Sequence, residues 1–276
     1  SDLTVDGSFT TGGAVTVMLI LAGVPPYAAL VIAALAGMTA GIVTGLLHTV
    51  FDIPAILAGI LTQFALYSIN LAIMGMSANK GIPVDKYVLF VTSRRIPGSI
   101  LAALILAAVL IAVLYWYFGT QHGSAMRATG CNLEMAKAQG ININSMKVIG
   151  LAMANSLVAL SGGLLSQYQG FADINMGRGA IVIGLAAVII GEVLGNALLG
   201  KRLNFAGRLA FVVIGGIIYY LVIVIVLWLK LDSNYLKLLT AIVVAVFLAV
   251  PNLQAKSRTS FRLAGKRSVN SAKEGE

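Results

Sequence analysis

The sequence predicts an all-α polytopic membrane protein with about eight apolar segments. Of its 276 residues, 59% are hydrophobic and only 11% are charged, whereas about a quarter of the residues in a soluble domain are charged. The apolar runs are continuous, which excludes the alternating pattern of a membrane β-barrel, and each is close to the roughly 20 residues that a helix needs to cross a bilayer. The candidate spans are residues 8–24, 27–50, 55–74, 99–118, 147–167, 179–199, 208–229 and 236–252.

The basic residues predict how the chain is oriented. Cytoplasmic loops of membrane proteins are enriched in lysine and arginine, and placing residues 119–147 in the cytoplasm puts most of the 19 basic residues on that side. This arrangement predicts a transmembrane domain over residues 1–252, with external loops near 75–98 and 168–178. It also predicts a basic, disordered cytoplasmic tail over 253–276 that contacts membrane lipid. The net charge of +9 is therefore interpreted as topology and not as a nucleic-acid-binding surface.

The first residues make a weak beginning for the first span. Thr4, Asp6 and Ser8 are polar, and carboxylates are costly at membrane depth. Either an extended stretch leads into a half-helix that starts inside the bilayer, or the first carboxylates lie in water. The chain opens on Ser1 without an initiator methionine or a basic amino-terminal region. We therefore expect no cleavable signal peptide, and we expect that the true start is missing from this sequence.

Small side chains recur every four residues in the second span, a pattern that allows another helix to approach closely in lipid. The fifth span has a similar face, which includes Asn155. In the sixth span, Glu192 lies either within the bilayer, where Lys201 or Arg202 would reach toward it, or at the cytoplasmic boundary. The repeated small residues of the second span are Ala29, Ala33, Gly37, Gly41 and Gly45.

The third span carries a polar face. Gln63, Tyr67 and Asn70 fall at positions i, i+4 and i+7 of an otherwise apolar helix, so they share one side of it. Because lipid penalises polar side chains, this face points into the helix bundle. It provides either hydrogen bonds between helices or a polar wall of a translocation path.

Residues 127–141 form the most polar interval of the sequence. Asn132 is a plausible helix N-cap, Glu134 lies where the helix dipole favours an anion, and Gly140 can end a helix in the left-handed conformation. The pattern predicts a short helix over residues 133–139 between two membrane spans. It is either an ordinary interfacial loop helix or a docking element for another protein.

The sequence contains no pattern typical of an enzyme. Gly195, Gly200 and Lys201 resemble part of a phosphate-binding loop, but Arg202 stands where serine or threonine would bind magnesium. We found no metal-ligand cluster and no nucleophile triad, and His48 and His122 are isolated from each other. We expect no catalytic residues, no metal site and no cofactor in this chain.

A short motif occurs twice. Residues 2–7 read DLTVDG and residues 173–177 read DINMG, so both have an acidic residue, an aliphatic one, a polar one and a later glycine. By the predicted orientation, the first copy enters the membrane from the cytoplasm and the second from outside. Inverted repeats with interrupted helices are typical of transporters.

Residues 127–142 read RATGCNLEMAKAQGIN, and the span that follows contains SGGL at residues 161–164. These residues resemble the cytoplasmic coupling region of permease subunits from bacterial ABC importers, in the family that handles branched-chain amino acids and simple sugars. Residues 2–9 and 167–177 resemble a sub-branch associated with amino-acid uptake, including aromatic amino acids. The resemblance covers nearly the whole chain. Family members carry a helix before the DLTV motif, which agrees with a missing start.

The resemblance implies an inverted-repeat, type II ABC importer-like permease in the bacterial inner membrane. It implies a homodimer, two cytoplasmic ATPase subunits that bind ATP and magnesium, and an extracytoplasmic binding protein or lipoprotein. The residues implied to couple the permease to the ATPase are Asn132, Leu133, Glu134, Met135, Ala136, Lys137, Gln139 and Gly140.

We predict that an amino acid is the solute. The predicted path residues are Asp6, Ser8, Phe9, Gln63, Tyr67, Asn70, Asn155, Gln167, Gln169 and Asn175. Most of these are neutral hydrogen-bonding groups, which suit a zwitterion and a sugar equally, so a sugar or nucleoside substrate stays open. An ion-coupled secondary transporter is the other alternative, motivated by Asp6, Glu192 and the inverted repeat.

Overall fold

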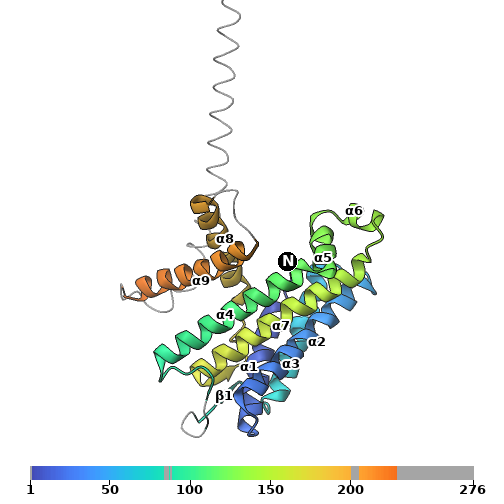
Figure 1. The fold of residues 1–276 in the computed structure, drawn as a ribbon. Coiled ribbons are helices and arrows are strands. Elements are labelled where there is room, and N and C mark those ends of the chain that lie inside the picture. The colour runs from blue at the N-terminus through green and yellow to red at the C-terminus, as the bar shows by residue number, and fades with distance from the viewer. Residues whose placement is uncertain (1, 84–86, 88, 200–204, 229–276) are drawn as a thin grey trace, which may run out of the picture. The chain divides into compact units, whose positions relative to one another are not determined.

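The computed structural model describes residues 2–83, 87, 89–199 and 205–228 (Figure 1). The chain divides into two compact units, Ser1–Ile181 and Val182–Glu276, which are described separately. The first unit contains the helices α1 (Val5–Leu21), α2 (Pro26–Thr49), α3 (Ala55–Ile73), α4 (Ile96–Gly119), α5 (Gln121–Cys131), α6 (Leu133–Ala138) and α7 (Ile143–Gln169), and the short strands β1 (Asn79–Gly81) and β2 (Phe171–Asp173). Helix α8 (Ala180–Leu199) begins at the end of this unit, and α9 (Phe205–Trp228) follows in the second.

The structure confirms an all-α polytopic membrane protein. Five helices of the described chain are long and apolar enough to cross a membrane: α2, α3, α4, α7 and the Phe205–Ile225 part of α9. Helix α1 and the Ala180–Gly195 part of α8 are apolar but shorter. Every predicted span up to residue 229 corresponds to one of these helices, and the predicted span 236–252 lies outside the described residues. The predicted tail, 253–276, lies outside them as well.

Helix α1 begins at Val5, so Asp6, Ser8 and Thr10 lie within it. The sequence left two interpretations open: an extended stretch that leads into a half-helix, or first carboxylates that lie in water. The structure has helix, and not an extended stretch, over Asp6, Ser8 and Thr10. The helix forms although its first turns are polar, because Ser8 and Thr10 are buried against protein and the hydroxyls of Thr10 and Thr11 donate to carbonyl oxygens one turn earlier. The polar groups are thereby satisfied without water.

The core of the first unit is a close packing of α7 against α1 and α2. Side chains of any size are excluded at the crossings: a Cβ on Gly12 of α1 would overlap the backbone of Ala159, and one on Gly41 of α2 would overlap the backbone of Leu151. The small residues predicted to form a packing face of the second span are all buried in α2. Small-residue packing brings helix backbones together in lipid as the repeat predicted.

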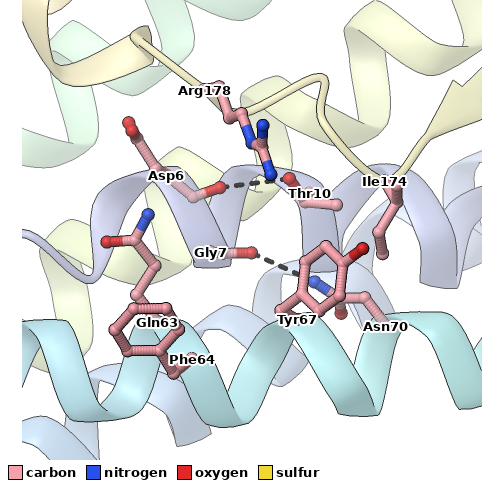
Figure 2. Close-up of a pocket in the computed structure, with 9 residues that line it drawn as sticks. All are labelled: Asp6, Gly7, Thr10, Gln63, Phe64, Tyr67, Asn70, Ile174 and Arg178. Atoms are coloured by element: carbon pink, nitrogen blue, oxygen red, sulfur yellow. Dashed lines mark hydrogen bonds between the residues drawn. The ribbon is translucent and has the colours of Figure 1, made fainter.

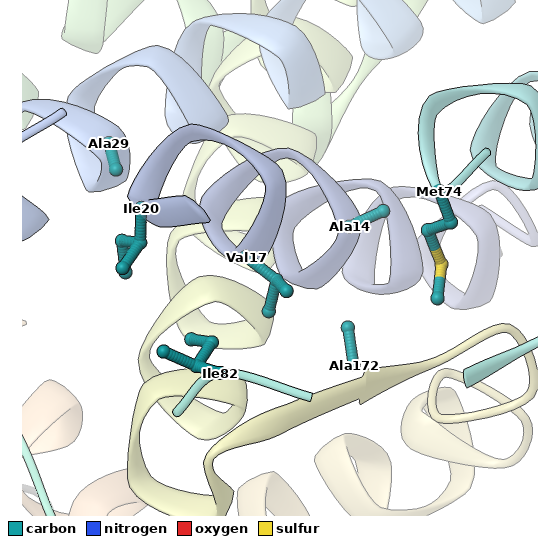
Figure 3. Close-up of a cluster of buried hydrophobic side chains, with 7 residues drawn as sticks. All are labelled: Ala14, Val17, Ile20, Ala29, Met74, Ile82 and Ala172. Carbon is teal, nitrogen blue, oxygen red and sulfur yellow. The ribbon is translucent and has the colours of Figure 1, made fainter. Parts of the chain in front are cut away.

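At the far end of α1, an apolar cluster joins the helices to a two-stranded sheet (Figure 3). Strands β1 and β2 pair antiparallel, with Lys80 opposite Ala172. The two segments predicted as external loops are therefore joined to each other. The cluster consists of Ala14, Val17, Ile20, Ala29, Met74, Ile82 and Ala172.

The interval between α4 and α7 is more ordered than the sequence predicted. Helix α5 starts directly after Thr120, whose hydroxyl accepts a hydrogen bond from the backbone N–H of Gly123 at 3.3 Å. The sequence analysis did not predict this helix, because its glycines and polar residues give little apolar periodicity. The predicted short helix is present as α6, one residue shorter than expected.

In the second unit, α8 packs on α9. A Cβ on Gly191 would overlap the backbone of Phe211, and one on Gly215 would overlap the backbone of Ala187. Tyr219 is buried between the two helices with Ala186 and Ile190. Glu192 is exposed on α8, and its predicted partners Lys201 and Arg202 lie outside the described residues.

Candidate functional site

A cavity of ≈310 Å³ lies between α1, α3 and the segment that leads from β2 to α8 (Figure 2). This volume is at the lower end of the range for small-molecule sites, about 300–1,000 Å³. The residues that line it are Asp6, Gly7, Thr10, Gln63, Phe64, Tyr67, Asn70, Ile174 and Arg178.

The polar face predicted on the third span lines this cavity. Gln63, Tyr67 and Asn70 all face it from α3. Asn70 is fully buried, and its Nδ2 donates to the carbonyl oxygen of Gly7 across the helix interface at 3.4 Å. Its Oδ1 has no hydrogen-bond partner among the described residues. Oδ1 is itself buried, so Asn70 contributes to the packing of α3 on α1 at the wall of the cavity.

Helix α1 supplies the opposite wall of the cavity. It also forms hydrogen bonds to the second copy of the repeated motif, residues 173–177, and to the residues just after it. The carboxylate of Asp6 accepts hydrogen bonds from the backbone N–H groups of Gly179 and Ile181, each at 3.1 Å, at the start of α8. A carboxylate at a helix N-terminus is stabilised by the N–H groups and by the helix dipole. The Thr10 hydroxyl accepts from the N–H of Gly177 at 3.2 Å. These bonds give Asp6 partners that the sequence analysis did not identify.

The two copies of the repeated motif also share a local turn. Oδ1 of Asp2 accepts from the N–H of Thr4 at 3.0 Å, and Oδ1 of Asp173 accepts from the N–H of Asn175 at 2.7 Å. In each copy an aspartate bonds the backbone two residues on, as in an Asx turn. The sequence similarity therefore corresponds to a common backbone feature.

Arg178 is one of the cavity residues that sequence reasoning missed. Figure 2 shows its guanidinium pointing toward Thr10 of α1. Arg178 itself is exposed and lies in the segment between β2 and α8. Its position directly after the second motif was the available signal.

Other predicted path residues form a network on a different side of α1. The Ser8 hydroxyl donates to Oδ1 of Asn155 at 2.6 Å, and Nδ2 of Asn155 donates to the Asp2 carboxylate at 2.7 Å. Ser8 and Asn155 are fully buried. This network joins α1 to α7 and does not line the cavity.

The remaining predicted path residues are placed elsewhere. Gln167 is fully buried; its Oε1 accepts from the N–H of Phe90 at 3.1 Å and its Nε2 donates to the carbonyl oxygen of Pro26 at 3.2 Å, so both ends of the amide hold protein segments together. Phe9 is half-buried on α1, and Gln169 and Asn175 are exposed.

Helix α6 has the caps that the sequence predicted. Oδ1 of Asn132 accepts from the N–H of Met135 at 3.1 Å, and Gly140 ends the helix with a positive φ of 77°. Ala136 is 2% exposed, whereas Leu133 and Met135 are 45% and 64% exposed. Glu134, Lys137 and Gln139 are also exposed. The helix thus presents apolar and charged side chains outward and rests on Ala136.

The connection from α6 to α7 is short and hydrogen-bonded. The N–H of Ile141 donates to the carbonyl oxygen of Ala136 at 3.1 Å. Oδ1 of Asn142 accepts from the N–H of Ser145 at 3.2 Å and caps α7. Because α6 ends at a left-handed glycine and α7 begins at once with a capped turn, the connection between the two helices has little conformational freedom.

A second cavity, of ≈540 Å³, lies beneath α5 and α6. Nζ of Lys147 donates to Nε2 of His48 at 3.3 Å, and Nδ1 of His48 lies 2.9 Å from the carbonyl oxygen of Ile53. These bonds tie the start of α7 to the end of α2. In the described residues, no three histidine, cysteine, aspartate or glutamate side chains are grouped to hold a metal ion.

Comparison with known proteins gives a family match over almost the whole chain. Residues 1–251 match the family model described as branched-chain amino acid transport system / permease component. No solved structure matches the chain.

Curated relatives include transport permeases. The chain is 38% identical over 274 residues to a tyrosine transport system permease protein of Clostridioides difficile, which covers 99% of this chain and 89% of that protein. It is 33% identical over 253 residues to the uncharacterized protein RP368 of Rickettsia prowazekii, covering 90% and 87%. It is also 33% identical over 205 residues to the autoinducer 2 import system permease protein LsrC of Yersinia pseudotuberculosis, covering 74% of this chain and 57% of that protein.

Proposed function

We propose that this chain, which belongs to the permease family of branched-chain amino acid transport systems, imports an amino acid with energy from a separate ATPase. It is a multi-pass protein of the bacterial inner membrane and the permease component of an ABC transport system. The observation that carries the proposal is the exposed, rigidly connected helix α6.

Helix α6 is suited to docking against an ATPase. It is held between α5 and α7, and its side chains other than Ala136 are exposed. Exposed Leu133 and Met135 offer apolar contact, and Glu134 and Lys137 offer charges for orientation. Such a mixture of an apolar centre and a polar rim is typical of specific protein interfaces. We infer that the exposed side chains of α6, with Leu133 and Met135 among them, form the docking surface.

A movement of α6 would be transmitted to the solute path through α7. The short connection at Gly140 and Asn142 joins the two helices, and α7 packs closely on α1 and α2. Asn155 of α7 bonds both Ser8 and Asp2. A shift of α7 caused by ATP-driven closure would therefore carry α1, which forms one wall of the cavity.

The relatives support an amino acid as the solute. The relative from Clostridioides difficile is named for tyrosine transport and matches 99% of this chain. A second candidate is an autoinducer-type signal molecule, because LsrC is named for autoinducer 2 import, but that match covers only 74% of this chain. The cavity contains Asp6 and Arg178, and charged groups favour a charged solute over a neutral one.

The proposed assembly contains two copies of this chain, two ATPase subunits and an extracytoplasmic binding protein. Most of helix α4 is available for contact with lipid or with a second copy of this chain, because Ser99 is the only buried residue of this helix. Large apolar residues along it are exposed, among them Leu101, Leu104, Ile105 and Val109. The family to which the chain belongs consists of permease components of transport systems, which function with further subunits.

Uptake in proteoliposomes tests the coupling. With the partner ATPase and binding protein present, Leu133→Asp is expected to reduce ATP-dependent uptake of L-tyrosine at least about tenfold, because it places a charge in the apolar centre of the docking face. Leu133→Met is the matched control and keeps most of the activity. Undiminished uptake by Leu133→Asp contradicts the docking role. Uptake without ATP that collapses with an ion gradient would instead identify a secondary transporter.

A further inference from the structure

We propose that the cavity of ≈540 Å³ beneath α5 and α6 binds the head group of an anionic phospholipid. The phosphate of the lipid accepts hydrogen bonds from Nζ of Lys147, and the acyl chains lie against the apolar part of the cavity wall. The proposal depends neither on the solute nor on the ATPase. It is also separate from the lipid contacts predicted for residues 253–276.

The charge of the cavity is the first observation. Lys147 and His48 both line the cavity, and both are half-buried, so each keeps surface that a ligand can contact. No aspartate or glutamate is among the described residues that line it. A recess with a lysine and without an acidic side chain attracts anions.

The imidazole of His48 holds the ammonium group of Lys147 in place. Nζ donates to Nε2 at 3.3 Å, so Nδ1 carries the hydrogen of a neutral imidazole and donates to the carbonyl oxygen of Ile53 at 2.9 Å. The ammonium group of a lysine has three N–H donors, and the bond to His48 uses one of them. The other two can donate to the oxygens of a phosphate, which form strong hydrogen bonds with a charged donor.

The apolar part of the wall is the second observation. Met126, Met146 and Leu151 line the cavity and are half-buried. The flexible thioether side chain of methionine adapts to irregular apolar shapes, such as that of an acyl chain. A small soluble anion would leave this wall in contact with water, whereas a lipid covers it. Charged and apolar groups together therefore favour an amphiphilic anion.

The position of the cavity favours a membrane lipid as this anion. His48 is the residue before the last one of α2, and Lys147 lies near the start of α7. Both helices are long and apolar enough to cross a membrane, so these two ends lie close to the lipid head groups. By the predicted orientation they are on the cytoplasmic side, where basic pockets between spanning helices bind acidic head groups.

Binding of phosphatidylglycerol to the purified full-length permease, measured by native mass spectrometry, tests the inference. We expect a preference over phosphatidylcholine with the same acyl chains. Lys147→Gln is expected to lower the affinity for phosphatidylglycerol at least about fivefold, because it removes the charge next to the phosphate. The new amide can still donate to His48, so the link between α2 and α7 can persist. Lys147→Arg keeps the charge and is expected to keep the preference.

Arg127→Gln is the matched control. Arg127 is an exposed arginine of α5 and is not among the residues that line the cavity, so this substitution is expected to leave the preference unchanged. The C-terminal tail is the same in all variants, so its lipid contacts do not affect the comparison. Equal losses in Lys147→Gln and Arg127→Gln would indicate general surface charge and overturn the inference.

The reactivity of Cys131 provides a measurement at the site that needs no variant. Cys131 lines the same cavity and is the only cysteine in the sequence. In the unmodified protein, phosphatidylglycerol is expected to slow its reaction with N-ethylmaleimide at least about threefold relative to phosphatidylcholine, because the bound lipid protects the occupied fraction. Glycerol phosphate, which has the anion without acyl chains, is expected to protect much less.

Three results would overturn the inference and leave the proposed function standing. The first is equal binding of phosphatidylglycerol and phosphatidylcholine by the unmodified permease. The second is equal protection of Cys131 by glycerol phosphate, which would identify a site for soluble anions. The third is protection of Cys131 by the partner ATPase and not by phosphatidylglycerol, which would assign the cavity to a protein contact.

Discussion

Asn155 shows how a single polar residue can be accommodated in a membrane-spanning helix. Its side chain accepts from Ser8 at 2.6 Å and donates to Asp2 at 2.7 Å and to the carbonyl oxygen of Leu151 at 3.0 Å. All the polar atoms of the amide are therefore satisfied, unlike those of Asn70. Two asparagines that look alike in sequence differ in this respect: Asn155 uses all of its polar atoms to hold helices together, whereas Asn70 bonds Gly7 of α1 through Nδ2 alone among the described residues.

Replacing Asn155 is expected to lower stability more than solute recognition. Asn155→Leu leaves Ser8 and Asp2 without this partner, and a buried unsatisfied group costs roughly 1–3 kcal/mol. A lower apparent Tm of the detergent-solubilised protein, with an unchanged KM for the residual uptake, is the expected result. Ser161→Ala is the control on the same helix, because Ser161 is exposed and bonds only the carbonyl oxygen of Val158 among the described contacts. A raised KM with unchanged Tm would place Asn155 on the path.

Sequence reasoning found only part of the cavity. Helical spacing brought Gln63, Tyr67 and Asn70 to one face, and all three line the cavity. Thr10 and Arg178 were missed because the cavity closes between segments separated by 167 residues along the chain, as the Gly177–Thr10 bond shows. A periodic pattern describes one helix at a time and carries no information about which distant segment covers it.

At the scale of elements, the packing of α7 depends on glycines at its crossings. Gly162 lies against the backbone of Phe9 on α1, and Gly163 lies against the side chain of Thr16. Without a hydrophobic driving force between helices in lipid, close backbone approach supplies the packing energy. The small-residue repeat in the sequence predicted such packing, but the partner of each helix became known from the structure.

A methyl group at one of these crossings is expected to destabilise the fold. In Gly162→Ala, the new Cβ would overlap the Phe9 carbonyl, and overpacking typically costs about 1–3 kcal/mol. A lower apparent Tm in a thermal unfolding series measures the effect. Gly150→Ala is a control on the same helix, because the nearest atom to its Cβ is Sδ of Met126 at 3.9 Å. Equal Tm values for the two variants would contradict the packing role.

Element boundaries were predicted best where the local chemistry is strong. The N-cap Asn132 and the left-handed Gly140 fixed the limits of α6 to within one residue. Helix α5 and the β1–β2 pair were not predicted. A helix with few apolar residues and a sheet of three-residue strands depend on neighbouring segments more than on their own sequences.

At the scale of the whole molecule, the orientation of the chain in the membrane is predicted from its basic loops and can be tested directly. Cys131 is the only cysteine in the sequence, and it is exposed at the end of α5, next to α6. If α6 docks on a cytoplasmic ATPase, Cys131 lies on the cytoplasmic side.

Cys131 is therefore expected to react with a membrane-permeant maleimide and not with an impermeant one in intact cells. Asn79→Cys in a Cys131→Ser background places an exposed thiol on β1, on the predicted external side, and is expected to react with both reagents. Labelling is measured by mass shift after purification. Reaction of Cys131 with the impermeant reagent in sealed cells would reverse the topology and remove α6 from the ATPase.

The bonds from Asp6 to the start of α8 have a consequence for biogenesis. The first turn of α8 is capped by a side chain that was synthesised 175 residues earlier, and the Thr10 hydroxyl fixes the segment just before it. Because synthesis proceeds from the N-terminus, α1 is made before residues 173–181, and we expect these residues to fold against it. Correct folding of the second copy of the motif is therefore expected to depend on the first.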